Sequence, residues 1–316
     1  MRFSIIVATI NRTEENLRLL KSIAAQQYDD LEVIFADQND DDRLNPILEC
    51  FRSLFPIVHL RSQKGLSRAR NKALALAQGE IICFPDDDCW YPHNLLIEMD
   101  RRFRENPSIA GFTGRCTDER GRLAAGGESK RAGLLNRHNV WRSGVSATMF
   151  LRSNVLKEVS GFDEELGVGA GTLFQSGEET ELLLHAIKKG FKIQYLPSLV
   201  VYHPLPPPYS RAAVTRAQLY GAGMGRVLRK HDESPIWSYY YMLFPLGGAL
   251  VALLQGDWRL AQIRVARACG RLQGWRADAP RSQERLAICS CQLPLNTVPA
   301  DTGIEEGMLT RCVRGV

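Results

Sequence analysis

The chain has 316 residues, of which 45% are hydrophobic, 24% charged and 8% aromatic. This composition is typical of a folded globular protein and excludes the disordered and fibrous classes. The net charge of +5 is uneven, because residues 1–203 carry 26 basic and 27 acidic side chains, whereas residues 204–316 carry 14 and 8. A nucleic-acid binder of this size usually has a basic main domain, so we predict no nucleic-acid partner.

Eight cysteines are scattered along the chain without a CxxC pair, so their spacing excludes a zinc ribbon and favours reduced thiols. The apolar run at the start of the chain meets the polar residues Asn11 and Arg12 before a signal-peptide core is complete. We therefore predict no secretory signal and a cytoplasmic protein.

The first half of the chain alternates apolar runs with helical segments. Short β-branched runs predict buried strands, and the segments between them have helical periodicity. The predicted strands cover 3–9, 31–37, 57–61 and 80–84, and the predicted helices 13–27, 66–78 and 92–106. Asn11, with Glu14 three residues later, is the expected cap of the first helix. This order predicts an α/β fold with a mainly parallel sheet, covered by helices, that binds ligands at the carboxyl ends of its strands.

The second half is less regular. Residues 115–140 and 166–177 are rich in glycine, and we predict a mobile loop in the first segment and a flexible loop in the second. We expect a strand at 146–153 and an amphipathic helix at 178–190, where Gly190 supplies the stop signal. A bent strand or strand pair is predicted at 192–203.

We divide the chain at two changes of composition. Residues 1–205 form the predicted α/β domain, 206–276 a helical region, and 277–316 a tail without periodicity that we expect to be disordered. The positive excess belongs to the last two parts, where a membrane or an acidic partner is the expected reason.

Residues 236–254 contain no charged side chain, and Trp237 begins an aromatic cluster of the kind found at membrane interfaces. In the next segment, one side of a predicted helix suits an anionic surface because it carries Arg259, Arg264, Arg267 and Arg271. We predict a peripheral or re-entrant attachment to the inner face of the cell membrane. The alternative is that both segments pack on the main domain.

Three adjacent aspartates, Asp86, Asp87 and Asp88, directly follow the predicted strand 80–84. A solvated turn is one interpretation, because aspartate is common in turns. Three like charges at a strand end repel one another without a cation, and carboxylates at i and i+2 suit Mg²⁺ or Mn²⁺ held jointly with a phosphate. We therefore predict a metal site with Asp88 as a direct ligand and Asp86 either sharing the ion or binding a ribose hydroxyl.

Other polar residues are expected at the same sheet edge. Asp37 ends the second strand, where it is either a turn residue or an acceptor for a base N–H or a ribose hydroxyl. Arg70 is either a surface arginine or a ligand of a nucleotide phosphate. Glu178 and Glu179 open a helix, where they stabilise its dipole or serve as a general base. His203 ends the last strand and is either structural or able to offer its imidazole to the metal or the pyrophosphate.

The order and spacing of these pieces resemble a family 2 glycosyltransferase with the GT-A fold, over residues 3–205. The matching segments, with the acidic strand end at Asp37, are SIIVATINR (4–12), GLSRARN (65–71), FPDDDCWYP (84–92), GFDEELG (161–167), GEETELLLHAIKKGFKI (177–193) and YLPSLVVYHP (195–204). The resemblance implies a domain that binds a nucleoside diphosphate sugar, with a divalent cation between the DxD aspartates and the diphosphate.

The resemblance also implies roles for individual residues. The nucleotide pocket would be lined by Ala8, Thr9, Arg12, Asp37 and Asp87. The resemblance assigns the metal to Asp86 and Asp88. The family's base is the second acidic residue of a Glu-Asp motif, which corresponds to Glu179. This chain has Glu-Glu at the motif, so the carboxylate is displaced by about one methylene group and Glu178 remains a rival.

The implied reaction is a single inverting displacement, in which Glu179 takes the proton of the acceptor hydroxyl and the metal neutralises the leaving diphosphate. The predicted partners are the sugar donor and a glycan or lipid-linked acceptor, in cell-surface polysaccharide or glycolipid synthesis. One alternative is a nucleotide-sugar-binding module that has lost activity. A sugar-nucleotide pyrophosphorylase is disfavoured, because the first strand lacks a glycine-rich loop, and a Rossmann oxidoreductase is excluded by the missing GxGxxG.

Overall fold

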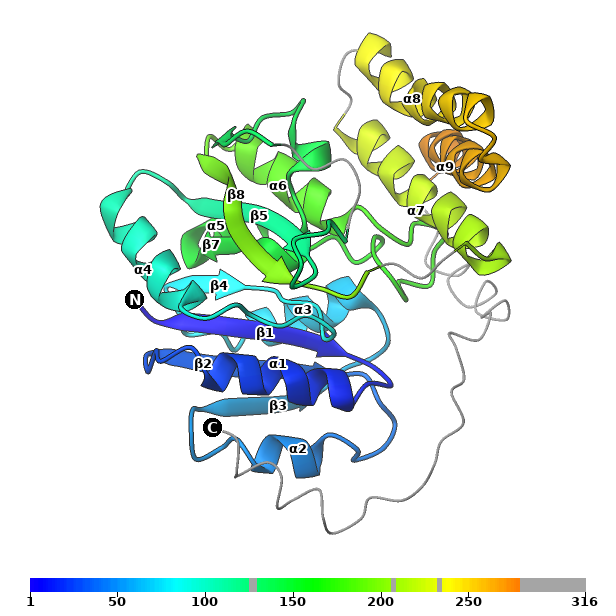
Figure 1. The fold of residues 1–316 in the computed structure, drawn as a ribbon. Coiled ribbons are helices and arrows are strands. Elements are labelled where there is room, and N and C mark those ends of the chain that lie inside the picture. The colour runs from blue at the N-terminus through cyan, green and yellow to red at the C-terminus, as the bar shows by residue number, and fades with distance from the viewer. Residues whose placement is uncertain (125–129, 206–208, 232–234, 279–316) are drawn as a thin grey trace.

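The computed structural model describes residues 1–124, 130–205, 209–231 and 235–278. Within these residues the chain forms an α/β layer structure and a group of three C-terminal helices that lies to one side of it (Figure 1). Nearly all of the tail that was predicted to be disordered, residues 279–316, lies outside the described residues.

The core of the fold is a mixed β-sheet. Its strands are β1 Phe3–Thr9, β2 Leu31–Asp37, β3 Ile57–Arg61, β4 Ile81–Cys83, β5 Gly111–Thr117, β6 Gly133–Leu134, β7 Phe150–Arg152 and β8 Ile193–Tyr202. They lie in the order β3-β2-β1-β4-β7-β5-β8-β6. Strands β1 to β4 are parallel to one another, as predicted. In the other half β5 is parallel to β8, whereas β7 is antiparallel to β4 and β5, and β6 is antiparallel to β8, so the sheet is mainly parallel, as predicted.

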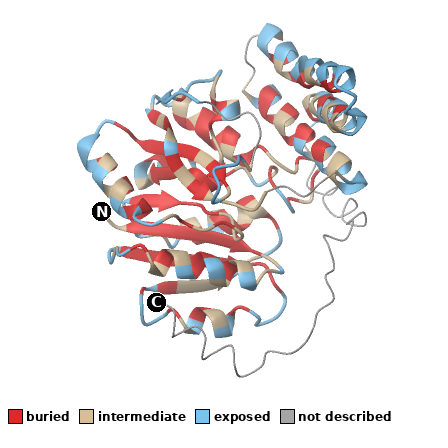
Figure 2. Ribbon diagram, viewed as in Figure 1, coloured by how far each residue is buried: buried red, intermediate tan, exposed pale blue. Residues whose placement is uncertain are grey.

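Side chains alternate along β1 and divide the core into two layers. Phe3, Ile5 and Val7 pack with α1, α2 and α4, whereas Ile6 and Ala8 pack with α3, α5 and α6. Every residue of β1 and β2 is buried, as coverage on both faces requires (Figure 2). The helices are α1 Glu14–Ala24, α2 Asn45–Glu49, α3 Leu66–Leu74, α4 Leu95–Glu105, α5 Ser153–Val159 and α6 Glu178–Lys188.

Two helix starts differ from the prediction. Asn11 does not cap α1, because it has a left-handed backbone with φ 58° and its own N–H donates to Asn39 Oδ1 at 2.6 Å. Helix α4 begins at Leu95 rather than Pro92, because Asn94 also has a left-handed backbone, φ 62°, that a helix cannot include.

The segments predicted as loops contain more structure than expected. Residues 115–117 belong to β5, whose sequence GFTGRCT is poor in β-branched side chains. Gly114 is required there because a Cβ atom at this position would collide with the carbonyl of Leu199, where the register with β8 shifts. In the loop 166–177, Leu166 and Phe174 are buried in the core, so this segment is closely packed rather than flexible.

The predicted strand at 146–153 is shortened by a 3₁₀ turn, η2 Ser146–Thr148, and only Phe150–Arg152 pairs in the sheet. The segment 192–203 forms one strand, β8. A second 3₁₀ turn, η1 Val140–Arg142, precedes these elements.

The C-terminal helices are α7 Arg211–Lys230, α8 Pro235–Leu254 and α9 Trp258–Arg276. Helices α7 and α9 approach one another closely because glycines line their contact. A Cβ atom at any of these positions would collide with the backbone of the opposite helix: Gly221, Gly225, Gly270 and Gly274. The spacing of four residues in both helices is the small-residue pattern that permits such contact.

The arginines of α9 are not arranged as predicted. Arg264 donates to the carbonyl of Gly248 and Arg271 to that of Tyr241, so both side chains hold α8 against α9. Arg259 lies over the rings of Tyr209 and Trp258. The prediction that all four arginines face an anionic surface is therefore wrong, because Arg264 and Arg271 donate hydrogen bonds to backbone carbonyls of α8 instead.

Helix α8 keeps its apolar side chains largely in contact with solvent (Figure 2). Among the described residues it is the one helix long and apolar enough to cross a membrane, with mean hydropathy 1.3 over 236–254 and 28% of that stretch buried. The exposed large apolar side chains of α8 are Ile236, Trp237, Tyr239, Tyr240, Leu243, Phe244, Leu246, Leu250, Val251, Leu253 and Leu254.

Candidate active site

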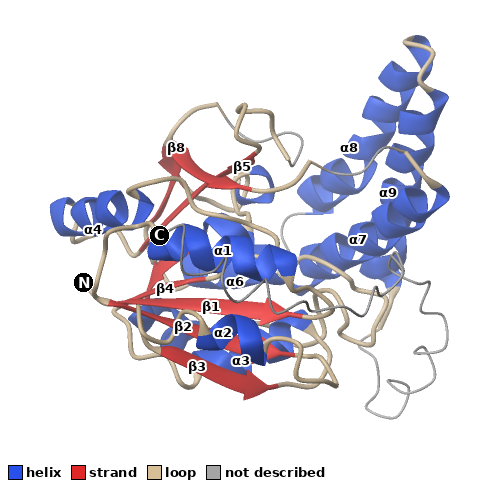
Figure 3. Ribbon diagram, turned by 60° about the horizontal axis from the view of Figure 1, so that its bottom comes forward, coloured by secondary structure: helices blue, strands red, loops and turns tan. Residues whose placement is uncertain are grey.

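The parallel strands bring the predicted polar residues to one edge of the sheet. Thr9 and Asp37 are register partners at the ends of β1 and β2, and β4 ends three residues before Asp86. Strands β1 and β3 end on the same side of the sheet (Figure 3). This clustering follows from topology, since the carboxyl ends of parallel strands share an edge.

The three aspartates are each paired with a basic side chain. Asp86 Oδ1 lies 2.9 Å from Nη2 of Arg70, and Arg12 Nη1 lies 2.9 Å from Asp87 Oδ1 and 2.5 Å from Asp88 Oδ2. Burial raises the pKa of Asp87 to about 7, although Arg12 opposes that shift. Arginines thus supply part of the neutralisation that the sequence prediction assigned wholly to a cation.

Possible metal ligands converge beside these ion pairs. Asp86, Cys89 and His203 offer ligand atoms that all lie within 4.8 Å of one another, and His203 Nε2 is 3.4 Å from Asp88 Oδ1. Cys89 would offer a soft sulfur ligand, which suits hard cations such as Mn²⁺ and Mg²⁺ poorly. Two carboxylates and one imidazole, from Asp86, Asp88 and His203, form a donor set that fits Mn²⁺.

Asp37 is completely buried and already saturated with hydrogen bonds. Its Oδ1 accepts from the backbone N–H of Asn39 at 2.9 Å and from the side-chain amide at 2.7 Å. Its Oδ2 lies 2.9 Å from His59 Nε2 and accepts from Arg61 at 2.8 Å. The sequence analysis missed His59 and Arg61. Their signal was two polar residues at alternate positions on one side of the short strand β3.

Arg70 is a buried arginine, not a surface one, with 1% of its side chain exposed. Besides Asp86, its guanidinium lies 3.6 Å from Glu178 Oε1 and 3.3 Å from the hydroxyl of Ser146. It therefore joins the aspartates at the end of β4 to the start of α6.

Glu178, which is buried, and Glu179, which is half-buried, form a pair at the first turn of α6. Their side chains are hydrogen-bonded to each other, and one oxygen of each has no hydrogen-bond partner among the described residues. Burial raises the pKa of both carboxyls, and the charge of Glu178 raises that of Glu179 further. Arg70 counteracts the rise in pKa at Glu178, so the pKa of Glu179 is the more strongly raised of the two.

The remaining predicted residues lie where β1 ends. Thr9 is buried, and its hydroxyl accepts from the amide of Asn16 at 2.8 Å and hydrogen-bonds Asp87. The side chain of Ala8 is buried in the core layer, so only its backbone can face a ligand. Arg12 is the most accessible of the three, with 37% of its side chain exposed.

Comparison with known proteins bears on this geometry. Residues 4–158 match the model of the family described as Glycosyl transferase family 2. These residues belong to glycosyl transferase family 2. The match confirms the resemblance drawn from the segments SIIVATINR to FPDDDCWYP.

Curated relatives include the uncharacterised glycosyltransferase YfnE of Bacillus subtilis, 34% identical over 91 residues that make up 28% of this chain and 23% of YfnE. Another is the GalNAc(5)-diNAcBac-PP-undecaprenol beta-1,3-glucosyltransferase of Campylobacter jejuni, 30% identical over 28% of this chain and 29% of the relative. The chain thus spans about a quarter of the length of these relatives.

Solved structures extend the likeness to the whole fold. S. aureus TarS 1-349 superposes with a TM-score of 0.56 at 18% identity, covering 87% of this chain and 89% of TarS. The mannosyltransferase PcManGT from Pyrobaculum calidifontis, in complex with GDP-Man and Mn²⁺, gives 0.62 at 16% identity, with 87% of both chains covered. The family 2 domain therefore has the GT-A fold.

Proposed function

We propose that this protein is an inverting glycosyltransferase that moves a sugar from a nucleoside diphosphate sugar to an acceptor hydroxyl. The observation that carries the proposal is a pair of arginine-centred networks, in which Arg12 contacts Asp87 and Asp88, and Arg70 contacts Asp86 and Glu178. These contacts support a site for a charged diphosphate beside carboxylates that can accept a proton. A complex of TarS with UDP-GlcNAc and one of PcManGT with GDP-Man and Mn²⁺ support a donor of this class.

Each residue then has a defined task. Asp86, Asp88 and His203 would hold Mn²⁺ or Mg²⁺, which supplies electrostatic stabilisation of the leaving diphosphate when bound. Arg12 and Asp87, with the backbone at Ala8 and Thr9, line the nucleotide side of the site. Asp37 orients His59 and Arg61 toward the base and ribose.

Glu179 is the base that removes the acceptor proton, and Arg70 holds Glu178 and Asp86 in fixed positions. A carboxyl with a raised pKa is the stronger proton acceptor once ionised, which favours Glu179 over its neighbour. Attack of the acceptor oxygen opposite the diphosphate inverts the anomeric centre in one displacement.

We place the acceptor among glycans or lipid-linked glycans, and the enzyme at the inner face of a membrane. The exposed apolar helix α8 supports this location. The Campylobacter relative, whose name includes a glycan linked through PP to undecaprenol, supports a lipid-linked acceptor. Cell-surface polysaccharide or glycolipid synthesis is the corresponding process.

The test is turnover of a panel of nucleotide sugars by the full-length protein with Mn²⁺, with Mg²⁺ and with a chelator. We expect release of nucleoside diphosphate from one donor, dependent on the cation and lost in Glu179→Gln but not in Glu98→Gln, an exposed carboxylate on α4. Tight donor binding without turnover for every sugar would instead identify a binding module.

A further inference from the structure

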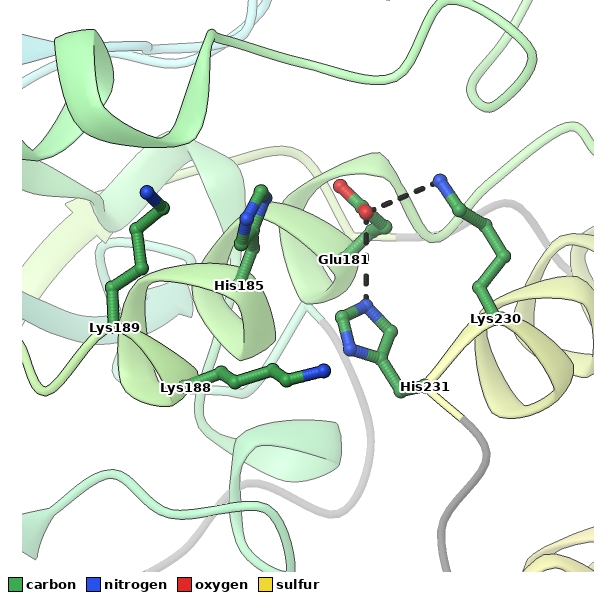
Figure 4. A pocket seen from close by; sticks show the side chains of 6 residues that line it. All are labelled: Glu181, His185, Lys188, Lys189, Lys230 and His231. Carbon is green, nitrogen blue, oxygen red and sulfur yellow. Dashed lines mark hydrogen bonds and ion pairs between the residues drawn. The ribbon is translucent and has the colours of Figure 1, made fainter.

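A cavity lined by charged side chains lies between α6 and the end of α7. It has a volume of about 400 Å³ and is lined by Glu181, His185, Lys188, Lys189, Lys230 and His231 (Figure 4). The proposed sugar transfer uses none of these residues.

The cavity has more positive than negative groups. Its carboxylate, Glu181, lies 3.2 Å from Lys230 and 3.6 Å from His231, and the hydrogen bond from His231 and the charge of Lys230 lower its pKa against the effect of burial, so it stays ionised. Lys230 is also paired with Asp163 at 2.6 Å. The internal acid is therefore fully engaged by α7.

The α6 side of the cavity provides the free cationic groups. Lys188 has no acidic partner within ion-pair distance among the described residues, and its side chain extends toward His231 (Figure 4). Lys189 forms a long ion pair with Glu158, with 3.6 Å between Nζ and Oε2. Lys189 points away from Lys188 on the other side of α6, so Lys188 is the ammonium group beside the imidazole of His231 (Figure 4). A phosphoryl group has several acceptor oxygens and would satisfy the ammonium group of Lys188 together with that imidazole.

The position of the cavity in the chain connects it with the apolar helix. His231 precedes Pro235, the first residue of α8, by four residues, so the two lie within about 14 Å of one another. Glu181, His185 and Lys188 lie on the stripe of α6 that starts at Glu178, because their spacing of three or four residues is helical. The cavity therefore lies close along the chain to the start of the apolar helix α8, and it shares one face of α6 with Glu178.

We propose that this cavity binds the phosphoryl group of a membrane lipid whose apolar chain contacts α8. The inference deepens the proposed function, since it assigns the anionic part of a lipid-linked acceptor to α6 and α7. Charge complementarity comes from Lys188 and His231, and the lipid origin of the phosphate is argued from the exposed apolar helix α8, which begins four residues after His231.

The experiment measures flotation of the full-length protein with vesicles of phosphatidylcholine, with and without a polyprenyl phosphate. We expect Lys188→Glu to weaken the phosphate-dependent part of binding about tenfold. Lys192→Glu, the same change at an exposed lysine outside the cavity, should alter it less than twofold. Binding of nucleoside diphosphate with Mn²⁺ should be equal in both variants and in the native protein, which verifies folding.

Equal losses in the two variants would mean diffuse surface attraction and would overturn the proposal. A second arm titrates inorganic phosphate alone by calorimetry. Strong binding of inorganic phosphate, with vesicle binding unaffected by Lys188→Glu, would identify a site for free phosphate and would overturn the lipid assignment. Neither readout needs catalysis, so absence of sugar transfer would refute the proposed function and leave this test decisive.

Discussion

The guanidinium of Arg70 lies 3.6 Å from Glu178, and this contact distinguishes two glutamates that are adjacent in the sequence. Arg70 stabilises the ionised form of Glu178, whereas Glu179 is raised further in pKa by the charge of its neighbour. The pair therefore holds a proton more firmly than an isolated carboxyl does, and Glu179 has to lose it before it can serve as a base.

Replacement of Glu179 by Gln should lower transfer by about 10²–10⁴-fold while donor binding is retained, because the amide keeps the size of the side chain but accepts no proton. Steady-state rates and nucleotide calorimetry together check this. Glu178→Gln serves as the matched variant and should retain more activity. The roles must be exchanged if Glu178→Gln abolishes transfer and Glu179→Gln remains active.

The pH dependence gives an independent check of the pair. Activity should rise with pH through a value above 4.5, the ordinary pKa of a glutamate, because the base works only when ionised. Glu178→Gln removes the negative charge that raises the pKa of Glu179, so the acidic limb of kcat/KM should move to lower pH. A limb that stays in place would show that the charge of Glu178 does not control the base.

Metal binding should depend on the carboxylates and not on the thiol. Asp88→Asn removes a hard oxygen donor and should abolish most of the Mn²⁺-dependent gain in nucleoside diphosphate affinity, measured by calorimetry. Cys89→Ser should leave that gain unchanged, because Mn²⁺ prefers hard oxygen ligands to sulfur. Asp41→Asn, at an exposed aspartate paired with Arg43, controls for general loss of charge. Equal affinity with and without Mn²⁺ in the native protein would refute the metal site.

The sequence predicted the parallel half of the sheet and the edge that gathers the site, because both follow from local patterns. Buried β-branched runs define β1 and β2, and their carboxyl ends must coincide. Strand β5 was missed because Gly114 serves a close contact with Leu199, which is distant in sequence. A local sequence pattern gives no information about contacts between residues that are distant in the chain.

The ion pairs of the site were unpredictable for the same reason. Arg12 meets Asp87 across 75 residues, and the burial of Arg70 depends on packing against Phe84 and Phe162. The sequence placed these charges near one edge, but which arginine joins which carboxylate is decided by the tertiary fold. The arginines of α9 show the limit most clearly, since their helical spacing was right and their partner, the backbone of α8, was not foreseen.

The glycine contact between α7 and α9 should be sensitive to a single methyl group. Gly225→Ala places a Cβ atom against the carbonyl of Arg271, so we expect a loss of about 1–3 kcal/mol in unfolding free energy. Gly247→Ala in α8 is the control, since nothing lies within 4 Å of its Cβ position and alanine favours a helix. Denaturant unfolding measures both. Equal stability of the two variants would show that α7 and α9 are not closely packed.

Helix α8 should determine membrane attachment through its exposed apolar side chains. Leu250 and Leu254 are 60% and 80% exposed, so a bilayer rather than the protein would bury them. Changing both to Glu removes burial worth roughly 3 kcal/mol or more, which should reduce vesicle binding by about a hundredfold. Leu123→Glu, at a leucine of the α/β domain that is 41% exposed, is the control and should have little effect. Flotation with anionic vesicles at low salt measures the difference, and a native protein that stays in the soluble fraction would show that α8 covers another protein surface instead.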